Sequence, residues 1–332
     1  MENKLTFQQF LAYNGYPLGR VQQILQKKKY TRFFTRKSNG KKRHIEAPGK
    51  KLKKLQRETN QVLQAQYMRI LPACAHGYIS AHPDVVPTRG IKTNALQHLG
   101  NAFLLNIDMQ DFFHSITPPL IQRGLAWLPL KFDKAMTDFI IDLATLDGRL
   151  PMGAPTSPVL SNICSLKLDE QLQNYCHPLE ITYTRYVDDM SFSAEYPFWE
   201  AHEPTIVQFI QDYGIAINPK KRKQYPPLSP KVVTGLEIEN HELQVAAAFE
   251  EGIRFAIEEY EKICWLNDAM DGSMPNLKAK KKHYEQVITG QLNFIEQMEG
   301  AASSDFQTLQ LAFEQTKMRR GNDRFDFYLK DF

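Results

Sequence analysis

The pattern of apolar and polar positions predicts β-strands in two stretches of the chain, and each stretch carries acidic residues at its end or its centre. Residues 103–108 read Phe-Leu-Leu-Asn-Ile-Asp, a β-forming run that ends on Asp108. Residues 182–193 alternate on both sides of Asp188 and Asp189, which predicts a β-hairpin with this acidic pair at its turn. Paired carboxylates in a concave site are costly unless a positive charge lies between them. The pattern therefore predicts a site for two divalent ions that catalyse phosphoryl transfer.

Helical periodicity is expected through much of the remaining chain. Before the last hundred residues, the expected helices cover residues 5–29 with a break at 14–17, and 50–71, 94–98, 118–126, 132–146, 158–175 and 203–213. Three longer helical patterns follow a β-rich turn at 231–238, and they cover residues 249–269, 278–298 and 305–319. These last patterns predict a small helical bundle.

A second hairpin is expected over residues 30–48, which alternate around the turn signal Ser38-Asn39-Gly40. Its return strand carries Lys41 and Arg43. Cations on such a strand suit the phosphates of a triphosphate, and the guanidinium of Arg offers forked donors. We therefore expect this strand to contact an incoming nucleotide.

Three residues just past the first acidic strand are further candidates. Asp111 and the backbone amides before it follow the strand end, where phosphates are often held. Phe112 and Phe113 fit core packing, and one of them at the edge of a nucleotide pocket would exclude a ribose 2′-OH by contact.

Two loops complete the set of candidates. Residues 148–158 are dense in Gly and Pro ahead of a helix, and Gly153 allows the backbone to approach a base or sugar closely. Residues 214–223 are expected to form a strand and a basic turn. There Lys220 or Lys221 either meets a leaving pyrophosphate or belongs to a solvated loop.

The composition is that of an ordinary globular protein, with 332 residues, 42% hydrophobic and 23% charged. No run of 18 apolar residues and no apolar core of a signal peptide is present, so we expect a cytoplasmic protein without a membrane partner. The four cysteines are scattered, which favours buried, reduced thiols over disulfides or zinc ligands.

Charge is distributed unevenly along the chain. Residues 1–60 hold 16 Lys and Arg against 3 Asp and Glu, a net charge of +13, whereas the whole chain carries only +4. Aromatic residues Tyr30, Phe33 and Phe34 lie among these cations. Basic residues that recur on successive elements with aromatic residues between them favour a nucleic-acid surface over a merely solvated face.

Five motifs, in their order and spacing, resemble a known family. They are Asn94-Ala-Leu-Gln-His98, Ile107-Asp108 through Phe113, Leu150-Pro-Met-Gly-Ala-Pro-Thr-Ser-Pro158, Tyr186-Val-Asp-Asp189 and Val233-Thr-Gly-Leu236. Together they resemble the bacterial retron reverse transcriptases, and the first and last are typical of that group. The resemblance covers about residues 20–320.

The resemblance implies an α+β fold of the right-hand polymerase type. Fingers would span residues 1–106 with part of 120–150, an antiparallel-sheet palm 107–239, and a helical thumb 240–332. Such enzymes are RNA-directed DNA polymerases that use dNTPs to copy a structured non-coding RNA into single-stranded DNA, often joined to a guanosine 2′-OH. The RNA and the DNA product stay bound, and many such complexes serve antiphage defence with a separate effector protein.

The resemblance also implies roles for the acidic residues. Asp108 and Asp188 would bridge two Mg²⁺ ions, and Asp189 would support the second acidic position. Mn²⁺ suits the same carboxylates. Arg43, with Lys41, matches the residues that bind the incoming triphosphate.

Other motif residues have implied roles in nucleotide choice and in binding primer or RNA. Phe113 matches the aromatic residue that rejects ribonucleotides, and Val233, Thr234 and Gly235 match the segment that positions the primer end. Asn94 and His98 either shape the junction of fingers and palm or touch RNA.

One position departs from the family pattern. Met152 stands where the motif usually has Gln, whose side chain helps place the incoming nucleotide. A thioether offers shape but is at best a weak acceptor. We expect nucleotide affinity and fidelity to change more than activity, because phosphoryl transfer depends chiefly on metals and positioning.

Two other functions compete with this interpretation. A protein that keeps the fold and binds RNA without chemistry is disfavoured by the intact acidic triad. A reverse transcriptase of a group II intron or of a diversity-generating element is disfavoured by the Asn94/His98 and Val233-Thr234-Gly235 signatures.

Overall fold

The computed structural model describes residues 4–36, 42–79, 89–239, 242–270, 272 and 274–319. The chain forms two compact units, Met1–Ser229 and Pro230–Phe332. The candidate catalytic residues all belong to the first unit, whereas the Val-Thr-Gly motif belongs to the second. The finer division into fingers, palm and thumb stays a prediction.

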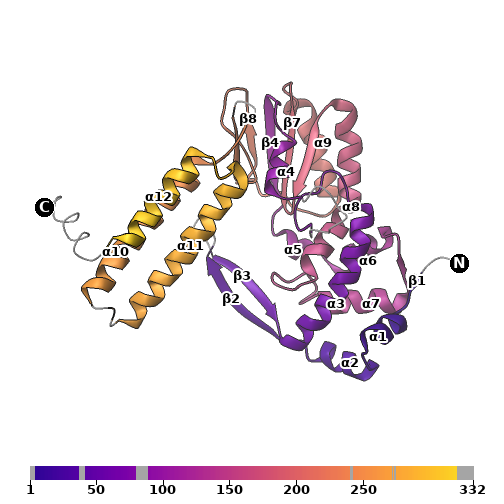
Figure 1. Cartoon of the computed structure of the whole chain (residues 1–332). Helices are drawn as coiled ribbons and strands as arrows, with labels where there is room; N and C mark the ends of the chain where they lie inside the picture. The colour runs from indigo at the N-terminus through magenta and orange to yellow at the C-terminus, as the bar shows by residue number, and fades with distance from the viewer. Residues whose placement is uncertain are drawn as a thin grey trace. The chain divides into compact units, whose positions relative to one another are not determined.

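The first unit contains a four-stranded antiparallel sheet, drawn in the upper part of that unit in Figure 1. Its strands run in the order β6 (Thr182–Tyr186), β7 (Asp189–Ala194), β4 (Phe103–Asp108) and β8 (Lys223–Tyr225). In the register of β4 and β7, Asp108 stands opposite Asp189. The predicted strand at 103–108 and the predicted hairpin at 182–193 are thereby confirmed, and they are neighbours in the sheet.

The two faces of this sheet differ because directly opposed residues point to the same side. One face carries the apolar pairs Leu105↔Phe192 and Ile107↔Met190, and it belongs to the hydrophobic core. The other face carries hydroxyl residues, among them Thr184 opposite Ser191. Both hydroxyl residues are nonetheless buried, so this face is also covered.

Nine helices of the first unit are described, together with two short 3₁₀ turns, η1 (Met68–Ile70) and η2 (His177–Leu179). They are α1 (Phe7–Asn14), α2 (Leu18–Gln26), α3 (Lys50–Tyr67), α4 (Ile91–Leu96), α5 (Phe112–Ser115), α6 (Pro118–Trp127), α7 (Lys134–Ala144), α8 (Ser157–Cys176) and α9 (Trp199–Asp212). Helix α8 is buried on most sides, because α3, α6, α9 and strand β6 all pack against it. It begins at Ser157 with Pro158 in the first turn, where proline costs no hydrogen bond.

Two smaller strand pairs complete the first unit. Strands β2 (Tyr30–Arg36) and β3 (Lys42–Pro48) form an antiparallel pair, as the alternation predicts, and their connecting turn lies outside the described residues. Strands β1 (Lys4–Leu5) and β5 (Lys131–Phe132) form a short parallel pair that the sequence did not suggest.

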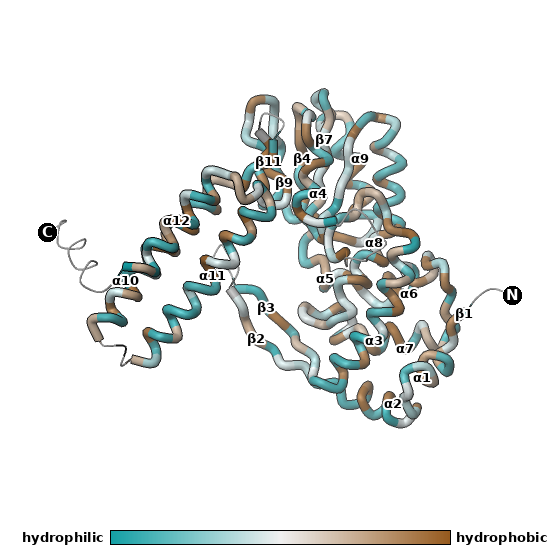
Figure 2. The backbone as a smooth tube through the Cα atoms, viewed as in Figure 1, coloured by the Kyte–Doolittle hydropathy of each residue, from teal (hydrophilic) through white to brown (hydrophobic). Residues whose placement is uncertain are grey.

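The second unit combines a small sheet with three helices. Strands β9 (Lys231–Val233), β10 (Leu236–Glu239) and β11 (Glu242–Val245) are antiparallel in the order β11-β10-β9. Helices α10 (Ala247–Ala269), α11 (Pro275–Glu299) and α12 (Ser304–Met318) pack on one another and confirm the predicted bundle. Figure 2 shows hydrophilic and hydrophobic bands alternating along α11 and α12, as expected of helices with one buried side.

The expected helices are confirmed in order, with ends that differ by a few residues. One expected strand is wrong: residues 215–222 form a loop with a single bridge, Met109↔Ile217, and the strand begins only at Lys223. The four cysteines are free and buried, as predicted. Within the described ranges, no helix combines the length and the apolar character that crossing a bilayer requires.

Candidate functional site

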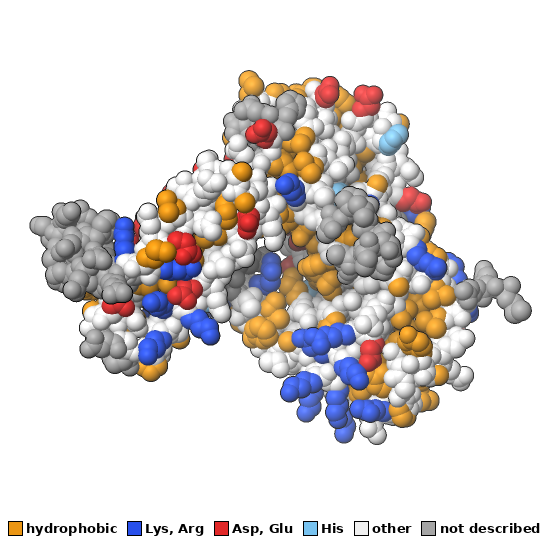
Figure 3. Space-filling model, viewed as in Figure 1, with side chains coloured by type: hydrophobic (Ala, Val, Ile, Leu, Met, Phe, Trp, Pro, Cys, Tyr) orange, Lys and Arg blue, Asp and Glu red, His pale blue; other side chains and the backbone are white. Residues whose placement is uncertain are grey.

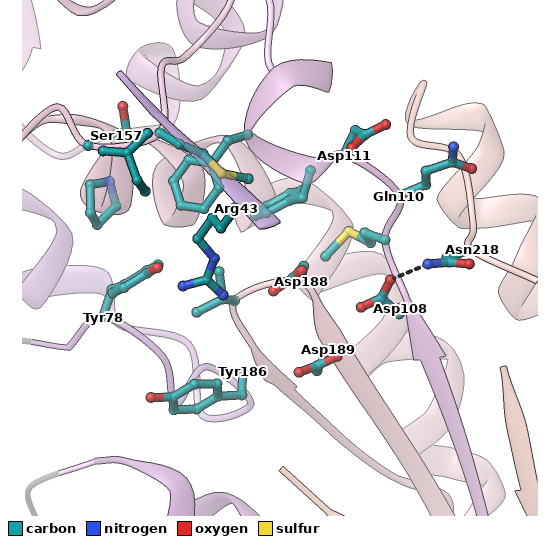
Figure 4. Close-up of a pocket in the computed structure, with 18 of the residues that line it drawn as sticks. Arg43, Tyr78, Asp108, Gln110, Asp111, Ser157, Tyr186, Asp188, Asp189 and Asn218 are labelled. Carbon is teal, nitrogen blue, oxygen red and sulfur yellow. Dashed lines mark hydrogen bonds between the residues drawn. The ribbon is translucent and has the colours of Figure 1, made fainter. Parts of the chain in front are cut away.

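A cavity of about 1090 Å³ opens in the first unit at the ends of β4 and the β6–β7 hairpin. Seven segments of the chain line it. The lining residues are Arg43, Ile45, Lys53, Arg57, Tyr78, Asp108–Phe113, Met152–Pro155, Ser157, Pro158, Tyr186–Asp189 and Asn218–Lys221. Figure 4 shows the three aspartates on one wall and Arg43 extending toward the hairpin turn.

The three predicted aspartates all line this cavity. Asp108 is the last residue of β4 and Asp189 the first of β7, so the strand register places them side by side. Asp188 occupies the turn, and its carbonyl accepts a hydrogen bond from the Met109 amide at 2.9 Å. Strand pairing alone therefore brings together acids that are about eighty residues apart in sequence.

The pKa of Asp189 depends on its burial and on the neighbouring charges. Burial is the largest cause that raises the pKa of Asp189, to about 7, and the charges of Asp188 and Asp108 add to it. The positive charge of Lys221 acts in the opposite direction on the pKa of Asp189, and the same ammonium forms an ion pair with the Asp108 carboxylate. Asn218 donates a second hydrogen bond to Asp108, at 3.1 Å. A cation is thus already attracted to this cluster.

The donor chemistry of the cluster suits a hard divalent cation, because carboxylate oxygens are the ligands that Mg²⁺ prefers. In the conformation described, however, no three His, Cys, Asp or Glu side chains among the described residues are arranged to hold an ion. Asp108 faces Lys221 and Asn218 instead. Binding a metal at Asp108 therefore requires that the Lys221 ammonium moves away.

The hairpin turn is backbone-strained. Tyr186 pairs with Asp189, which leaves a two-residue turn of Val187 and Asp188, and Val187 has φ 63°. Positive φ is unfavourable for a β-branched residue. Gly77 lies so close that a Cβ built on it would be 2.6 Å from Val187 Cγ2, so only glycine fits beside the turn.

A buried network under the hairpin holds this turn. Arg185 is fully buried, and its guanidinium donates to both carboxylate oxygens of Asp169 on α8, at 2.8 and 2.7 Å. The same guanidinium donates to Asn162 and to the carbonyl of Val187, each at 3.1 Å. Asn162 in turn donates to the Gly77 carbonyl at 2.9 Å. The network ties α8, the hairpin turn and the segment around Gly77 together.

The opposite part of the cavity is basic. Arg43 comes from β3 and lines the cavity as predicted, whereas Lys41 lies outside the described residues. Lys53 and Arg57 of α3 also line it, and sequence reasoning did not select them. Their spacing of four residues, which places both on one side of a helix, was the available signal.

The loop at 148–158 reaches the cavity next to β3. The Glu46 amide of β3 donates to the Met152 carbonyl at 2.6 Å, and Gly153, at φ 121°, approaches the backbone of Glu46. Arg149 fixes this contact through two hydrogen bonds to the buried Glu46 carboxylate, at 2.8 and 3.1 Å. Burial would raise the pKa of Glu46, but Arg149 and other cations outweigh it and lower that pKa.

The two aromatic candidates, Phe112 and Phe113, differ in burial and in the groups that they contact. Phe112 is buried and belongs to the hydrophobic core, whereas Phe113 is half-buried at the cavity and packs edge-on against Tyr78, with ring centroids 6.1 Å apart. Tyr78 was not expected in the site. Phe113 therefore holds the position from which an aromatic ring could contact a nucleotide sugar.

The expected phosphate site past β4 needs a correction. The Met109 and Gln110 amides donate to the carbonyls of Asp188 and Ala216, at 2.9 and 2.7 Å, so neither amide is available to a phosphate. Asp111 is exposed, has φ 47° and stands at the start of α5. Of the two candidate lysines of the basic turn, Lys221 pairs with Asp108, and Lys220 lines the cavity.

Asn94 and His98 cover the hydroxyl face of the sheet. Their side chains are 0% and 1% exposed. The two ring nitrogens of His98 lie 2.7 Å from the hydroxyls of Ser193 and Thr184. Neither side chain is accessible to RNA in this structure, which supports the role in shaping the junction rather than the role in RNA contact.

The Val233-Thr234-Gly235 motif forms a tight hairpin in the second unit. Val233 pairs with Leu236, and Thr234 and Gly235 between them have φ 49° and 87°. Positive φ at both central residues is typical of a type I′ turn, which explains the glycine. The Val233 side chain is buried, so it packs locally, and a role of the motif at the primer end stays a prediction.

Comparison with known proteins identifies the family. Residues 27–244 match the family described as reverse transcriptase (RNA-dependent DNA polymerase). The chain belongs to the reverse transcriptase family. This match also confirms the predicted α+β fold class, and it contains the acidic triad and all seven segments that line the cavity.

Curated relatives of this reverse transcriptase are retron enzymes, which confirms the resemblance stated above. The retron Ec86 reverse transcriptase of Escherichia coli is 32% identical over 51% of this chain and 52% of its own. The retron Mx65 reverse transcriptase of Myxococcus xanthus is 31% identical over 63% of this chain and 51% of its own. The chain thus spans about half the length of these relatives.

Among solved structures, telomerase from Candida albicans in complex with a fragment of telomeric RNA aligns with 89% of this chain and 64% of its own. The sequence identity of that alignment is 12% and its TM-score is 0.47.

The buried pair under the hairpin of this reverse transcriptase predicts a large coupling in stability. Arg185→Met leaves the Asp169 carboxylate buried without its partner, and we expect a loss of about 3–5 kcal/mol in the free energy of unfolding. Asp169→Asn should also destabilise. The double variant removes both charges and should be more stable than the sum of the two losses. Urea unfolding of the four proteins measures this coupling, and purely additive losses would contradict it.

His98 predicts a pH dependence of stability. Burial lowers the pKa of His98 to about 3, below the ordinary value of 6.5 that it regains on unfolding. As pH falls, the unfolded chain binds a proton at His98 that the folded chain does not bind. The contribution of His98 to the free energy of unfolding is therefore complete above pH 6.5 and decreases below it, by about 2 kcal/mol at pH 5.

The test compares unfolding free energies of wild-type protein and His98→Gln between pH 5 and 7.5. The variant should have a flatter pH profile. The exposed His177→Gln serves as the matched control and should leave the profile unchanged. An unaltered slope in His98→Gln would show that the buried imidazole does not cause the dependence.

Proposed function

We propose that this chain is the RNA-directed DNA polymerase of a retron. In this proposal it copies a structured non-coding RNA into branched single-stranded DNA by two-metal phosphoryl transfer. The family match and the retron relatives support the enzyme class.

The observation that carries the proposal is one cavity with acids on one wall and cations on another. Asp108, Asp188 and Asp189 converge from β4 and the hairpin turn, and Arg43 approaches from β3 (Figure 4). Phosphoryl transfer needs this combination, because the acids hold metal ions while cations neutralise the phosphates.

The residues suited to hold Mg²⁺ are Asp108 and Asp188, with Asp189 in support. Burial raises the pKa of Asp189, and the negative charges of Asp188 and Asp108 add to it; bound cations would offset that added charge. Bound metal would activate the primer 3′-hydroxyl and neutralise the leaving pyrophosphate. Mn²⁺ fits the same oxygen ligands.

The remaining cavity residues would bind and orient the nucleotide. Arg43 would pair with its phosphates, with Lys53 and Arg57 close by on α3. Lys221, which pairs with Asp108 in this structure, would bind the pyrophosphate if a metal ion replaced it at that carboxylate. Phe113, braced by Tyr78, would stand against the sugar and disfavour a 2′-OH.

The partners in this proposal are the cognate non-coding RNA, its DNA product and dNTPs, in the cytoplasm. The proposed partners also include a separate effector protein, with which the complex would act in antiphage defence. The similarity to retron enzymes supports this part of the proposal.

The first experiment expresses the gene with its flanking DNA and searches total nucleic acid for a small branched RNA–DNA species. A variant with Asp188→Ala and Asp189→Ala is the comparison. A discrete band that disappears in the variant supports both polymerase activity and the retron assignment.

Purified protein separates the other outcomes. If no band forms but the protein extends a primer on a generic RNA template, the enzyme stands and the retron assignment fails. If it extends no primer and still binds RNA, the protein is an RNA-binding member of the family without chemistry.

Met152 predicts a change in nucleotide binding. Its side chain lines the cavity but offers little hydrogen bonding. Met152→Gln should lower the KM for dNTPs severalfold with a smaller change in kcat, because an added hydrogen bond in a cavity contributes about 1 kcal/mol. Steady-state primer extension with a single nucleotide measures both constants. An unchanged KM would refute this role.

A further inference from the structure

A second cavity, of about 900 Å³, lies between α2 and the start of α3 in the first unit. Its lining residues come from α2, from the end of the following turn, and from the first turn of α3. None of them lines the cavity with the aspartates. It is therefore a separate feature of the same unit.

This second cavity is strongly basic. Arg20, Lys27, Lys29, Lys50 and Lys51 line it, and no acidic residue is found among its described lining residues. All five side chains are exposed, and within the described part of the chain none of them forms an ion pair. Figure 3 shows Lys and Arg side chains gathered over the region of α2 and α3. Five unpaired cations in one depression attract a polyanion.

The chemistry of the lining favours phosphates over bases. Apart from the five cations, the described lining residues are glycines, one glutamine and aliphatic residues, with no aromatic ring on which a base could stack. Binding of single-stranded nucleic acid through its bases relies on such rings. Lys and Arg without them contact the backbone and carry little sequence preference.

Helix α3 connects this cavity to the one with the aspartates. Its first turn presents Lys50 and Lys51 to the basic cavity, and Lys53 and Arg57 line the other. From Lys50 to Arg57 the helix rises about 10 Å, the length of about three nucleotides along a helical strand. One nucleic-acid strand can therefore leave the first cavity and follow cations on a single helix to the second.

We propose that the basic cavity binds the phosphate backbone of the template RNA outside the stretch being copied. The proposal rests on the proposed polymerase function for the identity of the strand. Residues 1–60 carry a net charge of +13, and only some of their cations line the cavity with the aspartates. In this proposal, the cations that line the basic cavity bind the template RNA.

The test measures equilibrium binding of one DNA primer annealed to RNA templates of different length, without dNTPs and across a salt series. One template ends just beyond the primer, and two others carry single-stranded extensions at the 5′ or the 3′ end. We expect one extended template to bind more tightly than the short one. The variant Lys27→Gln/Lys29→Gln/Lys51→Gln should lose that advantage, and its slope of log affinity against log salt should fall by about 2.

The matched control carries Lys4→Gln, Lys92→Gln and Lys134→Gln, which remove the same charge from exposed lysines outside both cavities. It should keep the advantage of the extended template. Primer extension on the short template should be unchanged in the Lys27/Lys29/Lys51 variant, which shows that the fold and the catalytic cavity are intact.

Two results would overturn the proposal: equal affinity of wild-type protein for short and extended templates, or equal losses in both triple variants. The second would mean that overall charge, rather than this cavity, attracts RNA. Failure of wild-type protein to extend any primer would instead reject the polymerase function, while the binding comparison would still decide whether the cavity holds RNA.

Discussion

The buried ion pair between Arg185 and Asp169 is the interaction on which the catalytic hairpin depends. A charge without its partner inside a protein costs several kcal/mol, so each of these residues requires the other to stay in place. Arg185 also donates to the Val187 carbonyl, and thereby fixes a turn whose positive φ is unfavourable for valine. Helix α8 supplies Asp169 and is itself held by packing on several sides. The geometry of the site is thus set by side chains that no substrate can touch.

Charge separation across the cavity follows from the same architecture. Antiparallel pairing of β4 with β7 brings acids together at one sheet end, where each raises the cost of ionising the next. Arg43, Lys53 and Arg57 come from elements outside this sheet, namely β3 and α3, whereas Lys220 and Lys221 come from the loop before β8. Lys221 pairs with Asp108 and thereby offsets part of the negative charge of the three aspartates.

Sequence alone predicted the elements whose signal is local. The alternation at 103–108 and 182–193 located both acidic strands, and the helical periodicity located the bundle. Long-range partners were not predictable: no local pattern shows that His98 fits between Ser193 and Thr184, or that Met109 and Gln110 donate to distant carbonyls. The apolar residues at 215–222 suggested a strand, but they form a loop. Ile215 and Ile217 pack on the hydrophobic core, and the bridge Met109↔Ile217 does not extend into a strand pair.

The hydroxyl face of the sheet shows how a polar pattern can be buried. Thr184, Ser191 and Ser193 would ordinarily mark a solvent-facing side, and alternation gives no reason to expect otherwise. His98 and Asn101 form hydrogen bonds with the hydroxyls of this face, so those hydroxyls are buried without being left unsatisfied.

An imidazole suits this place because each of its two nitrogens meets a hydroxyl that can donate or accept. Burial lowers the pKa of His98, and the nearby His76 adds to that effect, so the imidazole is neutral at neutral pH. His98 therefore packs on the face of the sheet that carries Thr184 and Ser193 and satisfies their hydroxyls.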